Sequence, residues 1–319
     1  MSVLIITEQS ENKIKKQSLE AISYGVTIAK QLNQDAIALV LGSTEDNLSS
    51  LGNYGIKRVV HQRNAGTVIS DNKIATKLIG ELCTQYQGQI IVFSNSLFGK
   101  SVAPRLSIKL RAGLVTGAIK LPEIGDGFTV RRSVFSGKAF ADVNISSQIK
   151  IITLNANTYD IAKFSDANAE VIESNIEVPA STIKIIESKK NEGSVSLTDA
   201  ETVVSGGRGL KGPENWGMIE DLAKALGAAT ACSRPVADAN WRPHHEHVGQ
   251  TGVAISPNLY IAVGISGAIQ HLAGVNRSKT IVVINNDPEA PFFKAADYGI
   301  VGDAFQVMPK IIEAVKNLG

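Results

Sequence analysis

Residues 259–271 read Leu259-Tyr260-Ile261-Ala262-Val263-Gly264-Ile265-Ser266-Gly267-Ala268-Ile269-Gln270-His271, and this stretch decides the fold. Its first part, Leu259–Val263, is a short apolar run that is typical of a buried strand. A Gly-x-Ser-Gly turn follows, and we expect a helix over about 266–273 with Ser266 as its N-cap. A strand, a glycine turn and a helix in this order indicate a βα unit of a parallel sheet.

The same alternation continues on both sides of this stretch. Further strands are expected at Thr202–Val204, Ala228–Ala231, Thr280–Ile284 and Tyr298–Val301, and further helices at about 214–226, 289–296 and 305–317. The second half of the chain is therefore predicted to be a doubly wound domain with a parallel sheet.

The first half of the chain also follows a βα pattern before its character changes. Strands are expected at Val3–Thr7, Ala36–Leu41, Arg58–His61 and Gln89–Phe93, and helices at about 16–32, 70–86 and 100–111. Between about 120 and 188 we expect added strands, among them Phe128–Val134 and Lys150–Leu154. The polar, lysine-rich stretch 188–194 is the predicted linker. We therefore predict an α/β protein with two domains, a nucleotide-binding-like N-terminal domain over 1–190 and a doubly wound C-terminal domain over 191–319.

Composition narrows the class of protein. Hydrophobic residues make up 44% of the 319 residues and charged residues 19%, as in ordinary globular proteins. The net charge of +2 argues against nucleic acid as a partner, because nucleic-acid binding needs a clear basic excess. No apolar run reaches the ~18–20 residues that a membrane-spanning helix needs. Cys83 and Cys232 lie far apart, and the N-terminus shows no secretory signal, so we expect a cytoplasmic protein without a disulfide.

A glycine-rich turn follows the first strand of the second domain. Gly207, Gly209 and Gly212 satisfy the G-x-G-x-x-G pattern of dinucleotide-binding turns, with Arg208 inside it. The pattern alone is weak, because such a turn often serves only to allow positive φ. The glycine turn can therefore bind a phosphate or can be purely structural. The guanidinium of Arg208 favours phosphate binding.

Two further strand ends carry polar residues. Free N–H groups at the start of the helix that holds Ser266 and His271 would favour an anion, such as a cofactor phosphate. The alternative is a structural helix, in which a lone histidine such as His271 is more often part of the packing than a ligand. Arg234 follows another strand, and Val248-Gly249-Gln250-Thr251-Gly252 is small and polar enough to approach a ligand. The run His244-His245-Glu246-His247 is better explained as a polar loop than as a metal site, and we predict no metal.

Together these stretches resemble the alpha subunit of electron transfer flavoproteins. Residues 259–274 match that family's signature almost letter for letter, and the stretches 205–209, 248–252 and 296–299 agree with it in the right order. The match is strong over about 200–319 and looser over 1–190. One departure is Asp238-Ala239-Asn240, where the family often has Asp-Ala-Gly and where a turn could differ.

The resemblance implies a heterodimer with a beta subunit, which often holds AMP, and FAD bound mainly by the C-terminal domain of this chain. Position by position, it assigns Arg208, Ser266, Gly267, Ala268, Ile269 and Gln270 to the pyrophosphate and ribityl region of FAD, and Asn285, Asp303 and Ala304 to the adenosine end. It places Ser233, Arg234, Gln250, Thr251 and His271 around the isoalloxazine ring, and it gives Val248 and Gly249 as further cofactor-binding residues. Arg234 would then supply a fixed positive charge, and His271 a hydrogen bond toward O2, so that both favour the negative charge gained on reduction.

The function implied by this resemblance is that of an electron carrier without its own substrate. It would accept electrons from flavin dehydrogenases such as the acyl-CoA dehydrogenases of fatty acid oxidation and pass them one at a time to a membrane quinone oxidoreductase. One alternative is an electron-bifurcating relative that uses NADH. The other is an NAD-dependent dehydrogenase built on Gly207–Gly212, although Asp221 and Asp238 are poorly placed to bind a ribose.

Overall fold

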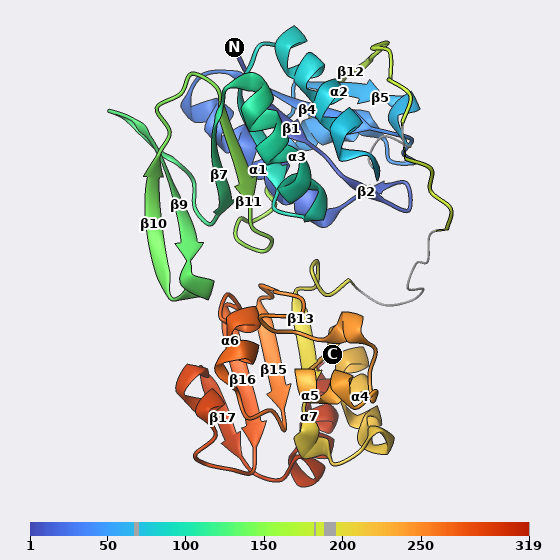
Figure 1. Ribbon diagram of the computed structural model, residues 1–319, viewed down its shortest axis with the longest axis vertical. Coiled ribbons are helices and arrows are strands. Elements are labelled where there is room, and N and C mark those ends of the chain that lie inside the picture. Colours follow the sequence, from blue (N-terminus) through green and yellow to red (C-terminus); the bar gives the residue numbers. More distant parts are fainter. Residues whose placement is uncertain (67–69, 182, 188–195, 319) are drawn as a thin grey trace. The chain divides into compact units, whose positions relative to one another are not determined.

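The computed structural model describes residues 1–66, 70–181, 183–187 and 196–318 (Figure 1). Packing divides the chain into two compact units, one of Met1–Val134 with Phe140–Lys189 and one of Phe135–Ala139 with Lys190–Gly319. The predicted linker, 188–194, lies outside the described residues, so the domain boundary at 190 remains a prediction. None of the helices in the described ranges is long and apolar enough to cross a lipid bilayer.

The first unit is built on a large, mainly parallel sheet. Its strand order is β10-β9-β7-β11-β6-β1-β4-β5-β12, with β8 beside β9, and a small hairpin of β2 and β3 lies apart. The bounds are β1 Ser2–Ile6, β2 Gln9–Ser10, β3 Lys13–Ile14, β4 Asp35–Leu41, β5 Arg58–Gln62, β6 Gly88–Ser94, β7 Gly113–Ala118, β8 Glu123–Ile124, β9 Phe128–Val134, β10 Ala139–Asn144, β11 Lys150–Leu154 and β12 Glu170–Glu173. The expected added strands 128–134 and 150–154 are both present.

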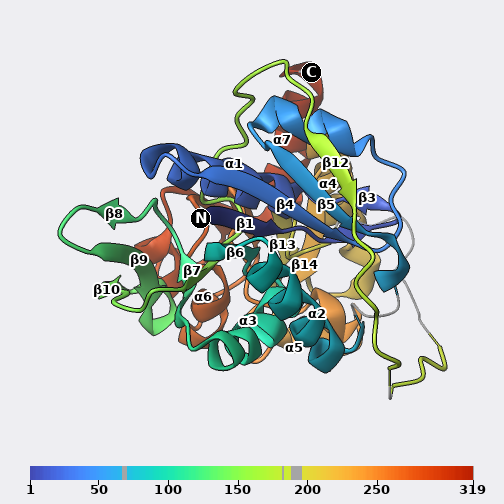
Figure 2. The ribbon, with the colours of Figure 1, turned by 90° about the horizontal axis from the view of Figure 1, so that it is seen from above.

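Helices cover both faces of this sheet. Alternate residues of β1 point to opposite faces, so Val3 packs in the same core as α1 (Lys16–Gln31) and Leu4 packs in the core of α2 (Asn72–Gln85) and α3 (Leu97–Leu110). Figure 2 shows α1 on one side of the strands and α2 and α3 on the other. A 3-10 helix, η1 (Leu48–Tyr54), precedes β5.

The second unit holds a fully parallel five-stranded sheet in the order β14-β13-β15-β16-β17. Its strands are β13 Thr202–Gly206, β14 Ala229–Cys232, β15 Leu259–Val263, β16 Thr280–Asn285 and β17 Tyr298–Val301. Numbered along the chain, this order is 2-1-3-4-5, so the chain changes direction across the sheet between β13 and β15. The predicted α/β architecture with a doubly wound second sheet is confirmed.

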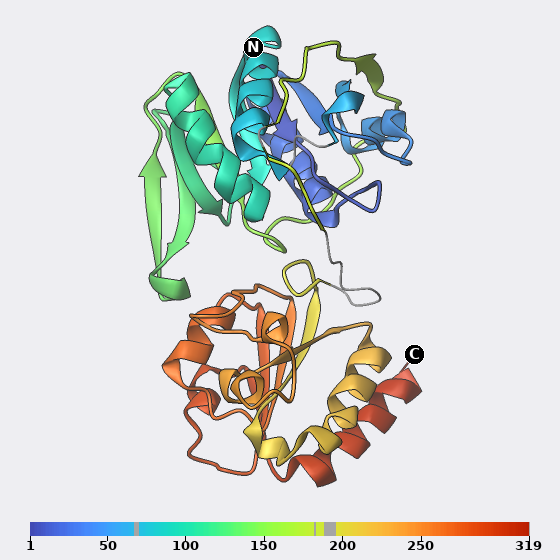
Figure 3. The same cartoon turned by 45° about the vertical axis from the view of Figure 1, so that its right-hand side comes forward.

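The helices of the second unit also lie on both faces of its sheet. On one face, α4 (Gly217–Leu226) and α7 (Ala304–Leu318) lie side by side and share a core through Leu222 and Met308 (Figure 3). On the other face, α6 (Ile269–Val275) and the 3-10 helix η8 (Pro291–Ala295) pack in the core of Tyr260. The short helix α5 (Arg234–Asp238) follows β14.

Two helix predictions need correction. The expected helix over 289–296 is the 3-10 helix η8, which begins at Pro291 and spans only Pro291–Ala295. The expected helix over 266–273 begins later, at Ile269, because Gly264 and Gly267 have φ values of 63° and 80° and keep the preceding loop out of helical conformation. Ser266 is therefore not the N-cap: Ala268 occupies that position, with no side-chain cap.

Candidate functional site

Two glycine loops, one with Gly207 and Gly209 after β13 and one with Gly264 after β15, meet where the chain changes direction across the second sheet. The N–H of Gly207 donates to the carbonyl of Val263 at 2.9 Å, and the N–H of Gly209 donates to the carbonyl of Gly264 at 3.0 Å. A Cβ atom on Gly209 would lie 2.7 Å from the Cα of Gly264, closer than real Cβ atoms approach. The loops therefore need glycine to approach each other, which is one structural role of the G-x-G pattern. Ligands of such sheets bind beyond this point, at the carboxyl ends of the strands.

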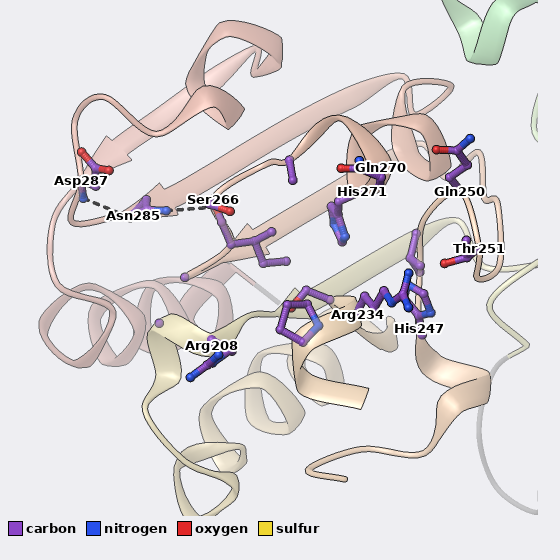
Figure 4. A pocket seen from close by; sticks show the side chains of 17 residues that line it. Arg208, Arg234, His247, Gln250, Thr251, Ser266, Gln270, His271, Asn285 and Asp287 are labelled. Carbon is purple, nitrogen blue, oxygen red and sulfur yellow. Dashed lines mark hydrogen bonds between the residues drawn. The ribbon is translucent and has the colours of Figure 1, made fainter. Parts of the chain in front are cut away.

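A cavity of about 540 Å³ opens beside these loops (Figure 4). Its volume lies within the ~300–1,000 Å³ that is common for small-molecule sites. The lining residues come from the segments that follow β13, β14, β15 and β16, including the first turns of α5 and α6, together with the loop around 247–251. They are Arg208, Gly209, Ser233, Arg234, Pro235, His247, Val248, Gln250, Thr251, Gly264, Ile265, Ser266, Ala268, Gln270, His271, Asn285 and Asp287.

The labelled side chains spread along the cavity rather than clustering at one point. In Figure 4, Asn285, Asp287 and Ser266 lie toward one end, while Gln250 and Thr251 lie toward the other. The imidazole of His271 points from α6 toward the side of the cavity that holds Arg234. The site is therefore shaped for an extended ligand with chemically different ends.

The loop between β15 and α6 offers hydrogen-bond donors to this cavity. In the described chain, the backbone N–H groups of Ser266, Gly267 and Ala268 donate to no acceptor. The side-chain amide of Asn285 fixes the loop by donating to the carbonyl of Ile265 at 3.0 Å, and its oxygen accepts from the N–H of Asp287. Free N–H groups held in this way favour anionic ligand groups.

The two arginines of the cavity differ in their surroundings. Arg208 lies in the 3-10 turn η5 (Arg208–Leu210), is exposed, and forms no ion pair with any residue that the structure describes. Arg234 opens α5, and its Nε lies 3.3 Å from the carboxylate of Asp238 one turn later. Arg208 is therefore free to bind an anion, whereas Arg234 is oriented by its partner.

Asn240 explains how the turn after α5 tolerates the departure from the family's Asp-Ala-Gly. Its φ is 56°, in the left-handed region. Glycine adopts this conformation most readily and asparagine tolerates it better than most residues. Asn240 can therefore hold the left-handed conformation that this turn requires.

His271 is buried between aromatic side chains. Its Nε2 lies 2.8 Å from the hydroxyl of Tyr260, and its ring meets Phe292 edge to face at a centroid distance of 5.7 Å. Its Nδ1 is buried without a hydrogen-bond partner among the described residues. Burial, helped by the nearby His247, lowers the pKa of His271 to about 4. The imidazole is therefore neutral at physiological pH.

The 244–247 run has one member in the cavity. His247 lines it, whereas His244 and His245 are exposed in the 3-10 turn η7 (His244–Glu246). The carboxylate of Glu246 is bound by Arg242 at 2.6 Å. Burial, and then the charge of Arg234, lowers the pKa of His247. Among the residues that the structure describes, no group of His, Cys, Asp and Glu side chains is arranged to hold a metal ion.

The cavity brings together most of the residues proposed from the sequence. Those that do not line it are Gly249, Gly267, Ile269, Asp303 and Ala304. Gly267 packs against Phe292, the side chain of Ala304 is buried in the core of α7, and the carboxylate of Asp303 accepts from the N–H of Phe305 at the start of α7. Their assignment to the cofactor remains a prediction.

Sequence reasoning missed several lining residues, namely Pro235, His247, Gly264, Ile265 and Asp287. Most of these lie within two residues of a predicted one, so a wider window after each strand would have found them. His247 immediately precedes Val248 and was set aside with its polar neighbours, although an imidazole directly before a ligand-binding loop was a usable signal.

Comparison with known proteins agrees with this geometry. Residues 196–276 match the model of the electron transfer flavoprotein FAD-binding domain, and residues 3–179 match that of the electron transfer flavoprotein domain. The chain is 34% identical over 320 residues to the electron transfer flavoprotein subunit alpha of Bacillus subtilis, with 99% of this chain and 98% of that protein covered. It is 35% identical over 323 residues to the subunit alpha of Syntrophomonas wolfei, with 98% of each covered. It is 36% identical over 334 residues to the mitochondrial subunit alpha of Dictyostelium discoideum, with 98% of this chain and 91% of that protein covered.

Proposed function

Because this chain belongs to the family of electron transfer flavoprotein alpha subunits, whose C-terminal domain binds FAD, we propose that it carries electrons from flavin dehydrogenases to a membrane quinone oxidoreductase. We further propose that it does so as a heterodimer with a beta subunit and has no substrate of its own. Acyl-CoA dehydrogenases are the expected donors.

The residues of the cavity fit FAD. The unpaired guanidinium of Arg208 and the free N–H groups of Ser266 and Ala268, which all line the cavity, suit a pyrophosphate. The buried Nδ1 of His271, which lacks a partner in the described chain, suits a polar edge of the flavin ring. We propose that these residues, with Arg234, Gln250 and Thr251, hold the cofactor.

A single observation carries the proposed electron-carrier role: Arg234 and His271 line the same cavity at the carboxyl ends of the strands. When bound, FAD takes up and releases electrons one at a time. A fixed cation and a neutral hydrogen-bond donor beside the ring favour the negative charge that arrives with an electron, without adding acid–base chemistry on a substrate. This arrangement supports a carrier rather than a catalyst.

The arrangement of the second sheet argues against the NAD-dependent dehydrogenase. That class places an acidic residue at the end of the strand after the glycine turn, where it binds a ribose. Here β14 ends at Cys232, Asp221 lies within α4, and Asp238 is paired with Arg234 at the end of α5.

The proposal is tested by anaerobic reduction of the purified complex of this chain with its beta subunit. A catalytic amount of an acyl-CoA dehydrogenase with its substrate should bleach the FAD absorbance, and a quinone oxidoreductase supplied with a quinone as electron acceptor should restore it. Reduction by NADH alone would instead indicate the bifurcating alternative. A preparation that binds NADH but contains no flavin would overturn the proposal.

A further inference from the structure

The hydroxyl of Tyr260 lies within hydrogen-bonding distance of the His271 ring, and the Val248 backbone, which acts to raise the pKa of His271, lies near the ring as well. The Tyr260 side chain is fully buried on β15, and its hydroxyl lies 2.8 Å from Nε2 of His271. The ring of Tyr260 lies 6.1 Å from that of His271, and Phe292 meets the imidazole from another side. Aromatic neighbours therefore hold the imidazole in place while one hydroxyl contacts one nitrogen.

The protonation of both partners limits how this hydrogen bond can form. Burial raises the pKa of Tyr260 far above its usual value, although the nearby Ser205 hydroxyl acts in the opposite direction, so the phenol keeps its hydrogen. His271 is neutral and carries a single N–H, on either Nδ1 or Nε2. The hydrogen bond at one ring nitrogen decides which nitrogen carries that hydrogen.

We propose that Tyr260 is a positioning residue that donates to Nε2 of His271 and so places the imidazole hydrogen on Nδ1. No described residue meets the geometric requirements of a hydrogen bond to Nδ1, although the Val248 backbone lies near enough to act on the pKa of His271, so an N–H on Nδ1 would donate to a ligand group in the cavity. With the opposite tautomer, Nδ1 would be an acceptor and would repel a reduced, negatively charged flavin edge. Tyr260 thus acts on the cofactor through His271, without lining the cavity itself.

This inference rests on the proposed function for its redox consequence only. The tautomer is a property of the protein and can be observed whether or not the complex accepts electrons from any donor. The two claims can therefore fail separately.

The test is nitrogen NMR of the heterodimer labelled with ¹⁵N-histidine, with His271 assigned by loss of its signals in His271→Gln. We expect a protonated Nδ1 and an unprotonated Nε2 at neutral pH. In Tyr260→Phe, which keeps the ring packing, this pattern should change to a mixture of tautomers, and the first reduction potential of bound FAD should fall. An Nε2–H tautomer in the parent protein, or an unchanged pattern in Tyr260→Phe, would overturn the proposal.

Two controls separate this role from a general loss of packing. Tyr24→Phe removes another buried tyrosine hydroxyl, which donates to the carbonyl of Lys120 at 3.0 Å in the first unit. Ser205→Ala removes the other hydroxyl near Tyr260. Both variants should keep the Nδ1–H signal and the potential of the parent. If Ser205→Ala changed the tautomer as strongly as Tyr260→Phe, the hydrogen bond would be assigned to the wrong partner.

Discussion

At the scale of single residues, the two arginines that line the cavity differ in their ion pairing. Arg208 is exposed and free of ion pairs with the described residues, as a phosphate ligand requires. Arg234 is held by Asp238, so its charge has a fixed position but is partly balanced. We therefore expect Arg234 to raise the reduction potential of a bound flavin only moderately, because the side chains of Arg234 and Asp238 are each more than half exposed to solvent.

Replacing Arg234 by alanine should lower the first reduction potential of bound FAD. Loss of the cation disfavours the extra negative charge, and we expect a shift on the order of 50 mV, since a tenfold change in a one-electron equilibrium corresponds to about 59 mV. Spectroscopic redox titration of the heterodimer measures it. Arg63→Ala, which removes an exposed and ion-paired arginine from the first unit, is the matched control and should leave the potential unchanged.

His271 should make the chain less stable in acid. Its pKa is about 4 in the folded chain against about 6.5 when unfolded, so below pH 6.5 the unfolded state binds the proton first. Stability is therefore full above about pH 6.5 and declines as the pH falls to about 4, by about 3 kcal/mol at most. Urea unfolding of the FAD-free heterodimer at several pH values measures this decline. His271→Gln should reduce it and His245→Gln, at an exposed position, should not; equal slopes in all three proteins would contradict the assignment.

At the scale of secondary structure, strands were easier to predict than short helices. The limits of β9, β11, β15 and β17 were predicted to the residue, because each is an apolar or alternating run bounded by turn residues. The five-residue helix α5 was missed, since it is too short to show a helical period.

The site was predictable for a related reason. Arg234, Gln250 and His271 follow strand ends or small polar turns, and a parallel sheet brings such ends together. What the sequence could not show is which turn residues point into the cavity: Ser266 lines it, while neighbouring Gly267 packs against Phe292. The positive φ values of Gly264 and Gly267 decide which of these residues faces the cavity, and the hydrophobic periodicity of the sequence does not predict such values.

Adding a single methyl group at Gly209 should disturb the contact between the two glycine loops. In Gly209→Ala the new Cβ would meet the backbone of Gly264, so the β15–α6 loop must shift. We expect FAD affinity to fall about tenfold or more, equivalent to ~1.4 kcal/mol. Fluorescence titration of the FAD-free protein measures it. Gly217→Ala is the control, because a Cβ there meets nothing within 4 Å, and its affinity should match the parent. A normal affinity for Gly209→Ala would show that the loops adjust freely.

At the scale of the whole molecule, the family resemblance covers both units. The matched models span 3–179 and 196–276, and the relatives align over almost their full length. Each of these relatives is named as a subunit, which implies an assembly. These names support the heterodimer with a beta subunit that we propose for this chain.

Co-expression with a beta subunit should determine how much FAD the chain retains. We expect a one-to-one heterodimer with FAD after size-exclusion chromatography, and a chain produced alone that precipitates or loses the cofactor. Light scattering gives the stoichiometry, and the ratio of flavin to protein absorbance gives the occupancy. A stable monomer that keeps a full complement of FAD would contradict the heterodimer.

The strand order of the second sheet also constrains biosynthesis. β13 is made first and becomes an interior strand next to the edge, with β14 added at one side and β15 later at the other. One wall of the cavity therefore does not exist until translation has passed β16 and Asn285. Newly made protein can therefore complete its flavin site only after β16 has joined the second sheet.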